Sequence, residues 1–189
     1  MQLILILKME ENFKMVAKTL FGFEELLQKE LTQLGAQNVK VGTRVVTFYG
    51  DKGFMYKANL ALRTALKVLK PINEFKAFND KSLYDGIQRI DWSNYLTEHQ
   101  TFVIETTLHS DHFNHSQFVA LKSKDAIVDQ FREKTGTRPD IDKDFPDVKI
   151  HLHIDRDLVT VSLDTSGESL HRRGYKTATN IAPINEVLA

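Results

Sequence analysis

Residues 115–175 carry the pattern from which the fold follows: HSQFVALKSKDAIVDQFREKTGTRPDIDKDFPDVKIHLHIDRDLVTVSLDTSGESLHRRGY. At about 100° per residue, the first part places a group of apolar side chains on one helical face, the width of a core-facing stripe. They are Ala120, Leu121, Ile127, Val128 and Phe131. After a Pro-containing loop, 150–155 and 158–164 alternate around Arg156-Asp157, which predicts a β-hairpin. A helix packed on a sheet accounts for these apolar faces.

Lys124 is the one charged residue that projects into the apolar face of this helix. Lys122 and Arg132 lie on the opposite face with Asp125 and Asp129, at spacings that form weak surface pairs, so they need no function. An unpaired ammonium is costly to bury. We therefore expect Lys124 to extend to solvent, to pair with a carboxylate, or to contact a phosphate.

The upstream part predicts strand, helix, hairpin, helix and strand, which is the order of a ferredoxin-like βαββαβ unit. The corresponding residues are 13–18, 23–34, 38–50 around Gly42-Thr43, a helix N-capped by Asp51, and 68–78. Pro71 confines the last strand to a sheet edge or a bulge. A short helix capped by Asp80 and a strand at 101–108 follow, so the predicted fold class is α+β with a mixed sheet in the second part.

Composition limits the function. The 25 basic and 25 acidic residues cancel, so a nucleic-acid-binding patch has to be local. The absence of cysteine excludes disulfides, thiolate catalysis and cysteine zinc sites, and it indicates a reducing, cytoplasmic compartment. Residues 1–8 are too short to span a membrane and lack signal-peptide features, so 1–12 is expected to be an extension.

No familiar catalytic or metal motif is present. His109, His112 and His115 recur every third residue in a polar turn, where they do not converge on a metal. The series that starts at Asp140 fails as a calcium loop because Phe145 replaces the required glycine. Dinucleotide, P-loop and nucleophile-elbow motifs are also missing, so we expect neither a catalytic residue nor a metal.

What remains is a set of phosphate donors and rings for base stacking. The predicted RNA-binding residues are Lys122, Lys124, Arg132, Arg138, Arg172, Arg173 and Tyr175. Phe118 is a second candidate for stacking. For Arg172-Arg173, a solvated linker is an equally good interpretation.

Several segments together resemble a known family. They are FGFEELLQKEL at 21–31, residues 82–92, KSKDAIVD at 122–129, Arg138-Pro139-Asp140, SGESLHRRGY at 166–175 and residues 182–186. The sequence resembles the N-terminal part of bacterial THUMP-domain methyltransferases that act on guanine N2 of 23S ribosomal RNA. Related proteins are sometimes catalogued as N6-adenine DNA methylases.

The resemblance implies an extension at 1–12, a ferredoxin-like subdomain at 13–66 whose last strand reaches up to 78, a THUMP RNA-binding domain at 67–166, and a linker at 167–189. It also implies a methyltransferase domain that uses S-adenosylmethionine, begins near residue 182 and continues beyond the sequence given. The implied partners are 23S ribosomal RNA and that domain, with no membrane. Alone, this chain should bind RNA and catalyse nothing.

Two departures leave the RNA target open: Asn114-His115 replaces a usual Arg-Asn, and Asn185 stands where the family usually has a basic residue. One alternative is a THUMP module attached to a transfer-RNA-modifying enzyme. Another is a non-enzymatic interaction protein.

Overall fold

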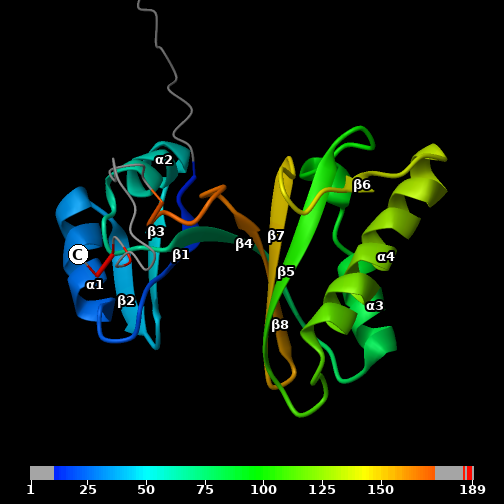
Figure 1. Cartoon of the computed structure of the whole chain (residues 1–189), viewed down its shortest axis with the longest axis horizontal. Coiled ribbons are helices and arrows are strands. Elements are labelled where there is room, and N and C mark those ends of the chain that lie inside the picture. Colours follow the sequence, from blue (N-terminus) through cyan, green and yellow to red (C-terminus); the bar gives the residue numbers. More distant parts are fainter. Residues whose placement is uncertain (1–10, 173–184, 186, 189) are drawn as a thin grey trace, which may run out of the picture. The chain divides into compact units, whose positions relative to one another are not determined.

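The computed structural model describes residues 11–172, 185 and 187–188. The chain divides into two compact units, one formed by 1–68 with 168–189 and the other by 69–167. Figure 1 labels the elements along the chain. Among the described helices, even the 20-residue α4 lacks the apolar composition of a membrane-spanning segment.

The first unit is the ferredoxin-like one that the sequence predicted. Its elements are β1 (Phe13–Lys18), α1 (Glu24–Leu34), β2 (Gln37–Gly42), β3 (Val45–Gly50), α2 (Lys52–Ala61) and the start of β4 (Lys67–Lys76). The strand order is β2-β3-β1-β4, in which β1 and β3 are antiparallel central neighbours. Gly35 ends α1 in the left-handed conformation, at φ 99°. Asp51 caps α2 by accepting a 2.7 Å hydrogen bond from the Phe54 N–H, as expected.

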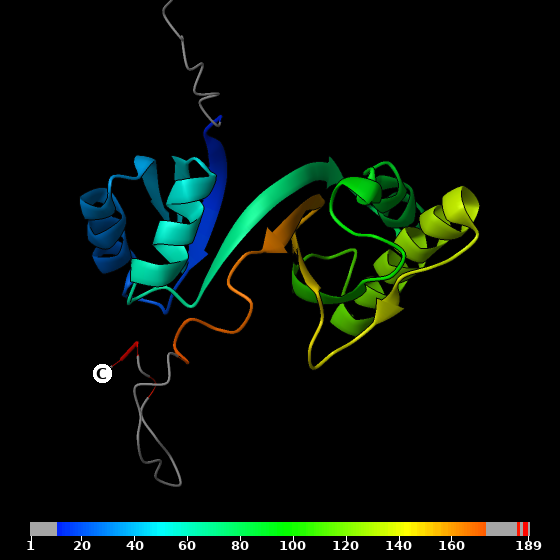
Figure 2. The ribbon, with the colours of Figure 1, turned by 90° about the horizontal axis from the view of Figure 1, so that it is seen from above.

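The core of this unit lies between one face of the sheet and the two helices. Met15 and Ala17 of β1 and Val46 and Phe48 of β3 are fully buried, and they alternate with partly exposed residues. Leu27 and Leu31 of α1 and Ala58 of α2 belong to the same apolar cluster. Figure 2, seen from above, shows α1 and α2 side by side. The two helices therefore cover one face of the sheet, which leaves the alternate residues of β1 and β3 on the other face.

The second unit carries the remaining elements. They are the rest of β4, α3 (Asp80–Gln88), the 3₁₀ turn η1 (Trp92–Asn94), β5 (Thr101–His109), α4 (Ser116–Thr135), β6 (Asp140–Ile141), β7 (Val148–Asp155) and β8 (Leu158–Asp164). The strand order is β4-β8-β7-β5-β6, and β5 runs parallel to both β6 and β7. β7 and β8 form the predicted antiparallel hairpin around Arg156, whose φ is 55°.

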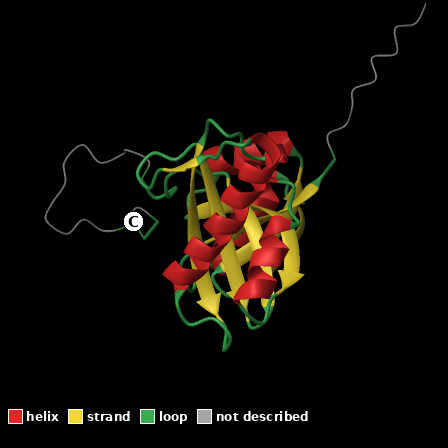
Figure 3. Ribbon diagram, turned by 90° about the vertical axis from the view of Figure 1, so that its right-hand side faces the viewer, coloured by secondary structure: helices red, strands yellow, loops and turns green. Residues whose placement is uncertain are grey.

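All eight described strands belong to one sheet, and helices α3 and α4 cover one face of its β8-β7-β5 part. Figure 3 shows the helices in red in front of the yellow strands. The cluster between the layers joins Leu83 and Ile87 of α3, Ile127 of α4, and Ile150 and Leu152 of β7, each fully buried. This packing confirms the predicted α+β class.

Two predicted details were wrong by one residue. The N-cap of α3 is Asn79 rather than Asp80, because the extended backbone of Asn79 lets its side chain accept from the Ser82 N–H at 2.9 Å. The first hairpin turns at Thr43-Arg44 rather than Gly42-Thr43, and Arg44 adopts the left-handed φ of 59°. The bulge expected at Pro71 is present, since the β4–β8 register shifts between Pro71 and Asn73.

Candidate nucleic-acid interface

The second unit contains a groove of about 710 Å³ between α4, β5 and the β6 region. Its lining residues are Val103, Ile104, Glu105, Thr106, Ser116, Gln117, Ala120, Leu121, Lys124, Ile141 and Lys143. The groove exists because β6 pairs with β5 only at Thr101 and Phe102. From Val103 onward, β5 has no strand partner on that side within the described residues, and α4 forms the facing wall.

Lys124 supplies one ammonium group to this groove. Its side chain is 30% exposed, and its Nζ lies 2.7 Å from the Asp125 carboxylate. Of the outcomes considered for Lys124, pairing with a carboxylate is therefore the one observed. The exposed Lys143 lines the same groove. No sequence pattern predicted Lys143 as a site residue, because only the path of the chain after α4 brings it to the same groove as Lys124.

The predicted apolar stripe of α4 was partly wrong. Ile127, Val128 and Phe131 are buried as expected, but Leu121 is 52% exposed and lines the groove. The fully buried Ser123 lies in the face that α4 turns toward the core. The helix is thus rotated relative to the prediction, and Lys124 lies at the margin of the core instead of inside it.

Lys122 and Arg132 contact the α3 side of α4 rather than the groove. Lys122 Nζ lies 4.9 Å from the centre of the Tyr84 ring, a cation–π contact with α3. Arg132 lies 3.4 Å from Asp129, and Asp129 accepts a 2.8 Å hydrogen bond from the Tyr84 hydroxyl. Burial of the phenol, followed by its hydrogen bond to Asp129, raises the pKa of Tyr84 to about 12. Lys122 thus contacts α3 directly, whereas Arg132 pairs with a carboxylate of its own helix.

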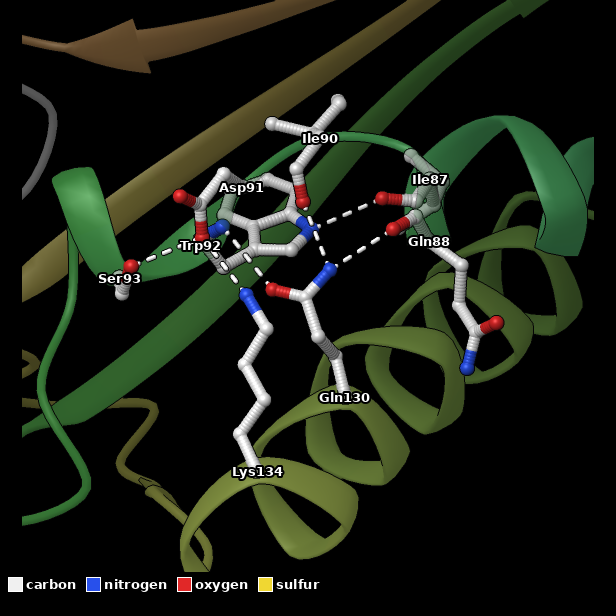
Figure 4. Close-up of polar contacts among 8 residues, drawn as sticks. All are labelled: Ile87, Gln88, Ile90, Asp91, Trp92, Ser93, Gln130 and Lys134. Carbon is white, nitrogen blue, oxygen red and sulfur yellow. Dashed lines mark hydrogen bonds and ion pairs between the residues drawn. The ribbon is translucent and has the colours of Figure 1, made fainter.

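A buried glutamine attaches the loop after α3 to the second half of α4 (Figure 4). The Gln130 side chain accepts from the Trp92 N–H at 3.0 Å and donates to the carbonyls of Gln88 and Ile90, both at 2.7 Å. Beside it, Lys134 lies 2.8 Å from Asp91, and that hydrogen bond is the main reason why the pKa of Asp91 is lowered. Sequence reasoning missed Gln130. Its position between Ile127 and Phe131 on the apolar face was the available signal.

The remaining predicted cations are not gathered with Lys124. Arg138 is exposed two residues before β6, and Arg172 is exposed in the first unit, where its N–H donates to the Ser169 carbonyl at 2.9 Å. Arg173 and Tyr175 lie outside the described residues. Among the described members of the predicted set, only Lys124 lines the groove.

Two histidines of the series His109, His112 and His115 have structural roles. His115 is the N-cap of α4, and its Nδ1 accepts from the Phe118 N–H at 3.2 Å. His112 packs edge-on against Phe78, with ring centres 5.8 Å apart. Within the described ranges, no three imidazole or carboxylate side chains gather as a metal site requires. The described part of the chain offers a groove whose charged lining residues are Lys124, Lys143 and Glu105.

Comparison with known proteins identifies both units. Residues 14–69 match the RlmL ferredoxin-like domain and residues 77–164 match the THUMP domain. Two similar solved structures are a predicted N6-adenine-specific DNA methylase from Listeria monocytogenes str. 4b F2365 and a possible methylase from Clostridium difficile 630. Both are 31% identical, with TM-scores of 0.80 and 0.81, over 94% of this chain and 47% of theirs.

A third is SMU.472, described as a methyltransferase and crystallised with SAH, at 30% identity and a TM-score of 0.79 over 95% of this chain and 48% of that one. This chain thus spans about half the length of each of these three proteins. It belongs with them as an RlmL ferredoxin-like domain followed by a THUMP domain, corresponding to their N-terminal half.

Proposed function

We propose that this chain is the RNA-binding region of an S-adenosylmethionine-dependent methyltransferase that modifies guanine N2 of 23S ribosomal RNA. The observation that carries the proposal is the match over 94% of this chain to one half of a methylase chain, in an arrangement that includes a THUMP domain. The SAH complex of a similar protein supports the cofactor. A ribosomal RNA substrate also implies a cytoplasmic location.

The chain matches 48% of a similar protein that was crystallised with SAH. We assign the methyl transfer and the S-adenosylmethionine site to a further domain of the parent protein. This region then holds the RNA and presents a base to that domain. Assayed alone with labelled S-adenosylmethionine, the chain should bind RNA and transfer no methyl group.

Within the THUMP unit, we assign the phosphate contacts first to Lys124 and Lys143 in the groove. Arg138 is a further candidate because it is exposed just before β6. Lys124 ranks first because it lines the groove, although Asp125 also engages it. Lys122 and Arg132 are weaker candidates because they do not line the groove and are engaged by Tyr84 and Asp129. Arg172, Arg173 and Tyr175 remain proposed contacts of the segment that follows the THUMP domain.

The salt dependence of RNA affinity tests whether the groove binds RNA. Removing one lysine that binds a phosphate should lower the slope of log affinity against log salt by about 0.7 to 0.9. Lys124→Ala and Lys143→Ala should each show that reduction with a structured 23S ribosomal RNA fragment. Lys81→Ala, an exposed lysine of α3, should leave the slope unchanged. Equal slopes for all three variants and the wild type would remove the groove from the RNA-binding surface.

A competition assay between RNAs tests which class of RNA the chain binds. The 23S fragment should outcompete a scrambled RNA and an unmodified transfer RNA. Preference for the transfer RNA would favour a transfer-RNA-modifying parent enzyme. Equal, weak binding of all three would favour a non-enzymatic interaction protein.

A further inference from the structure

The face of the ferredoxin-like sheet that α1 and α2 do not cover carries its own set of polar side chains. In β1 and β3, the residues facing the helices are fully buried, and the alternate residues point away from them. The register pairs Lys14 with Tyr49 across β1 and β3, so both lie on this second face. Lys40 of β2 pairs with Thr47 of β3 and lies there too.

This face is hollowed by about 460 Å³. The lining residues are Lys14, Asn38, Lys40, Val41, Gly42, Thr47 and Tyr49. A register shift between Gln37 and Lys40 makes room, and Asn38 within it adopts a left-handed φ of 50°. One aromatic ring is therefore bordered by ammonium groups on both neighbouring strands, with a carboxamide close to one of them.

The chemistry of the hollow selects its ligand. None of the described lining residues is acidic, so the exposed Lys40 makes the site favourable for an anion. The phenol ring of Tyr49 is partly exposed on a rigid strand and offers a flat apolar surface. A base that stacks on an aromatic ring while its phosphates meet lysines satisfies both features, and this is how single strands are bound without sequence readout.

We propose that this face of the ferredoxin-like unit binds a single-stranded segment of RNA, with one base stacked on Tyr49 and a flanking phosphate at Lys40. Asn38 is placed to hydrogen-bond the edge of that base. Four-stranded sheets with aromatic residues on an open face bind RNA in this manner in other proteins. The choice of RNA rests on the proposed function, whereas the hollow, its ring and its charge are independent of it.

The test measures fluorescence anisotropy of a short labelled oligouridine with the whole chain. Tyr49→Leu keeps an apolar side chain but removes the stacking surface, so binding should weaken about tenfold, within the range known for base–aromatic stacking. Tyr49→Phe keeps the ring and should bind like the wild type. Lys40→Ala should lower the salt slope by about 0.7.

Matched controls lie on the helical side of the same unit. Tyr56 of α2 is 60% exposed and Lys52 begins the same helix, so Tyr56→Leu and Lys52→Ala should change neither affinity nor salt slope. If the wild type binds oligouridine but Tyr49→Leu and Lys40→Ala bind it equally well, this site is overturned. A wild type that binds the structured 23S fragment but not oligouridine overturns the site alone. Failure to bind either RNA overturns the proposed function as well.

Discussion

Replacing Gln130 should destabilise the THUMP unit far more than replacing its exposed neighbours on α4. Its single carboxamide satisfies one N–H and two carbonyls of the segment between α3 and η1, and it is only 8% exposed. Gln130→Leu keeps the approximate volume but can neither donate nor accept. Gln130→Ala opens space that a water molecule can enter.

The magnitude follows from those three bonds. A buried donor left without a partner costs about 1 to 3 kcal/mol, and each hydrogen bond to a carbonyl that is removed takes away about 1 kcal/mol of net stability. Gln130→Leu should therefore lower the free energy of unfolding by about 3 to 5 kcal/mol. Gln130→Ala should lose about 2 to 3 kcal/mol, because water can partly replace the amide.

Urea unfolding followed by tryptophan fluorescence measures this directly. Trp92 is the only tryptophan of the chain, is fully buried, and takes part in one of the bonds in question, so its signal reports the second unit. Glu133→Ala, an exposed change on the same helix, should stay within about 0.5 kcal/mol of the wild type. A Gln130→Leu variant with the wild-type unfolding midpoint and slope would refute the reasoning.

Two further predictions concern the α3 layer and its glycine. A Cβ added at Gly86 would overlap the Phe75 ring, so Gly86→Ala should cost about 1 to 3 kcal/mol in the same urea assay, whereas Gly53→Ala in exposed α2 should be neutral or stabilising. The raised pKa of Tyr84, about 12 against an ordinary 10, means that its contribution to stability is complete below pH 10 and is lost as the pH rises toward 12. Ultraviolet titration, taken as the difference from Tyr84→Phe, should show this midpoint, and Asp129→Asn should lower it. An unchanged midpoint would contradict the contribution assigned to Asp129.

Local sequence patterns predicted the order of the elements except for the short β6 and η1. Alternation around Arg156-Asp157 predicted the β7–β8 hairpin, and the strand, helix, hairpin, helix, strand series predicted the ferredoxin-like unit. These features depend on neighbours within a few residues, so periodicity captures them. The choice between Asn79 and Asp80 as the cap did not follow, because both are good capping residues and only the backbone conformation separates them.

The candidate site was harder to predict from the sequence, because it depends on contacts between elements that are distant in the sequence. Periodicity placed Leu121 in the core, but the rotation of α4 depends on the α3 helix and the β5 strand against which it packs. The partners of Lys122 and Lys134, Tyr84 and Asp91, are about 40 residues distant in the sequence. No spacing rule within one helix contains that information.

The order of amino acids was enough to predict most of the elements and their succession, although not β6 or η1. It also showed that basic and acidic residues balance, which excludes a globally basic surface. Which cations share a surface became clear from the folded chain alone. The parallel pairing of β5 with β7 and the rotation of α4 place Lys124 in a groove and direct Lys122 toward α3. The physical reason is that charge neutralisation and packing act between residues that are close in space. The sequence alone shows which residues are close in space only when they are near neighbours along the chain.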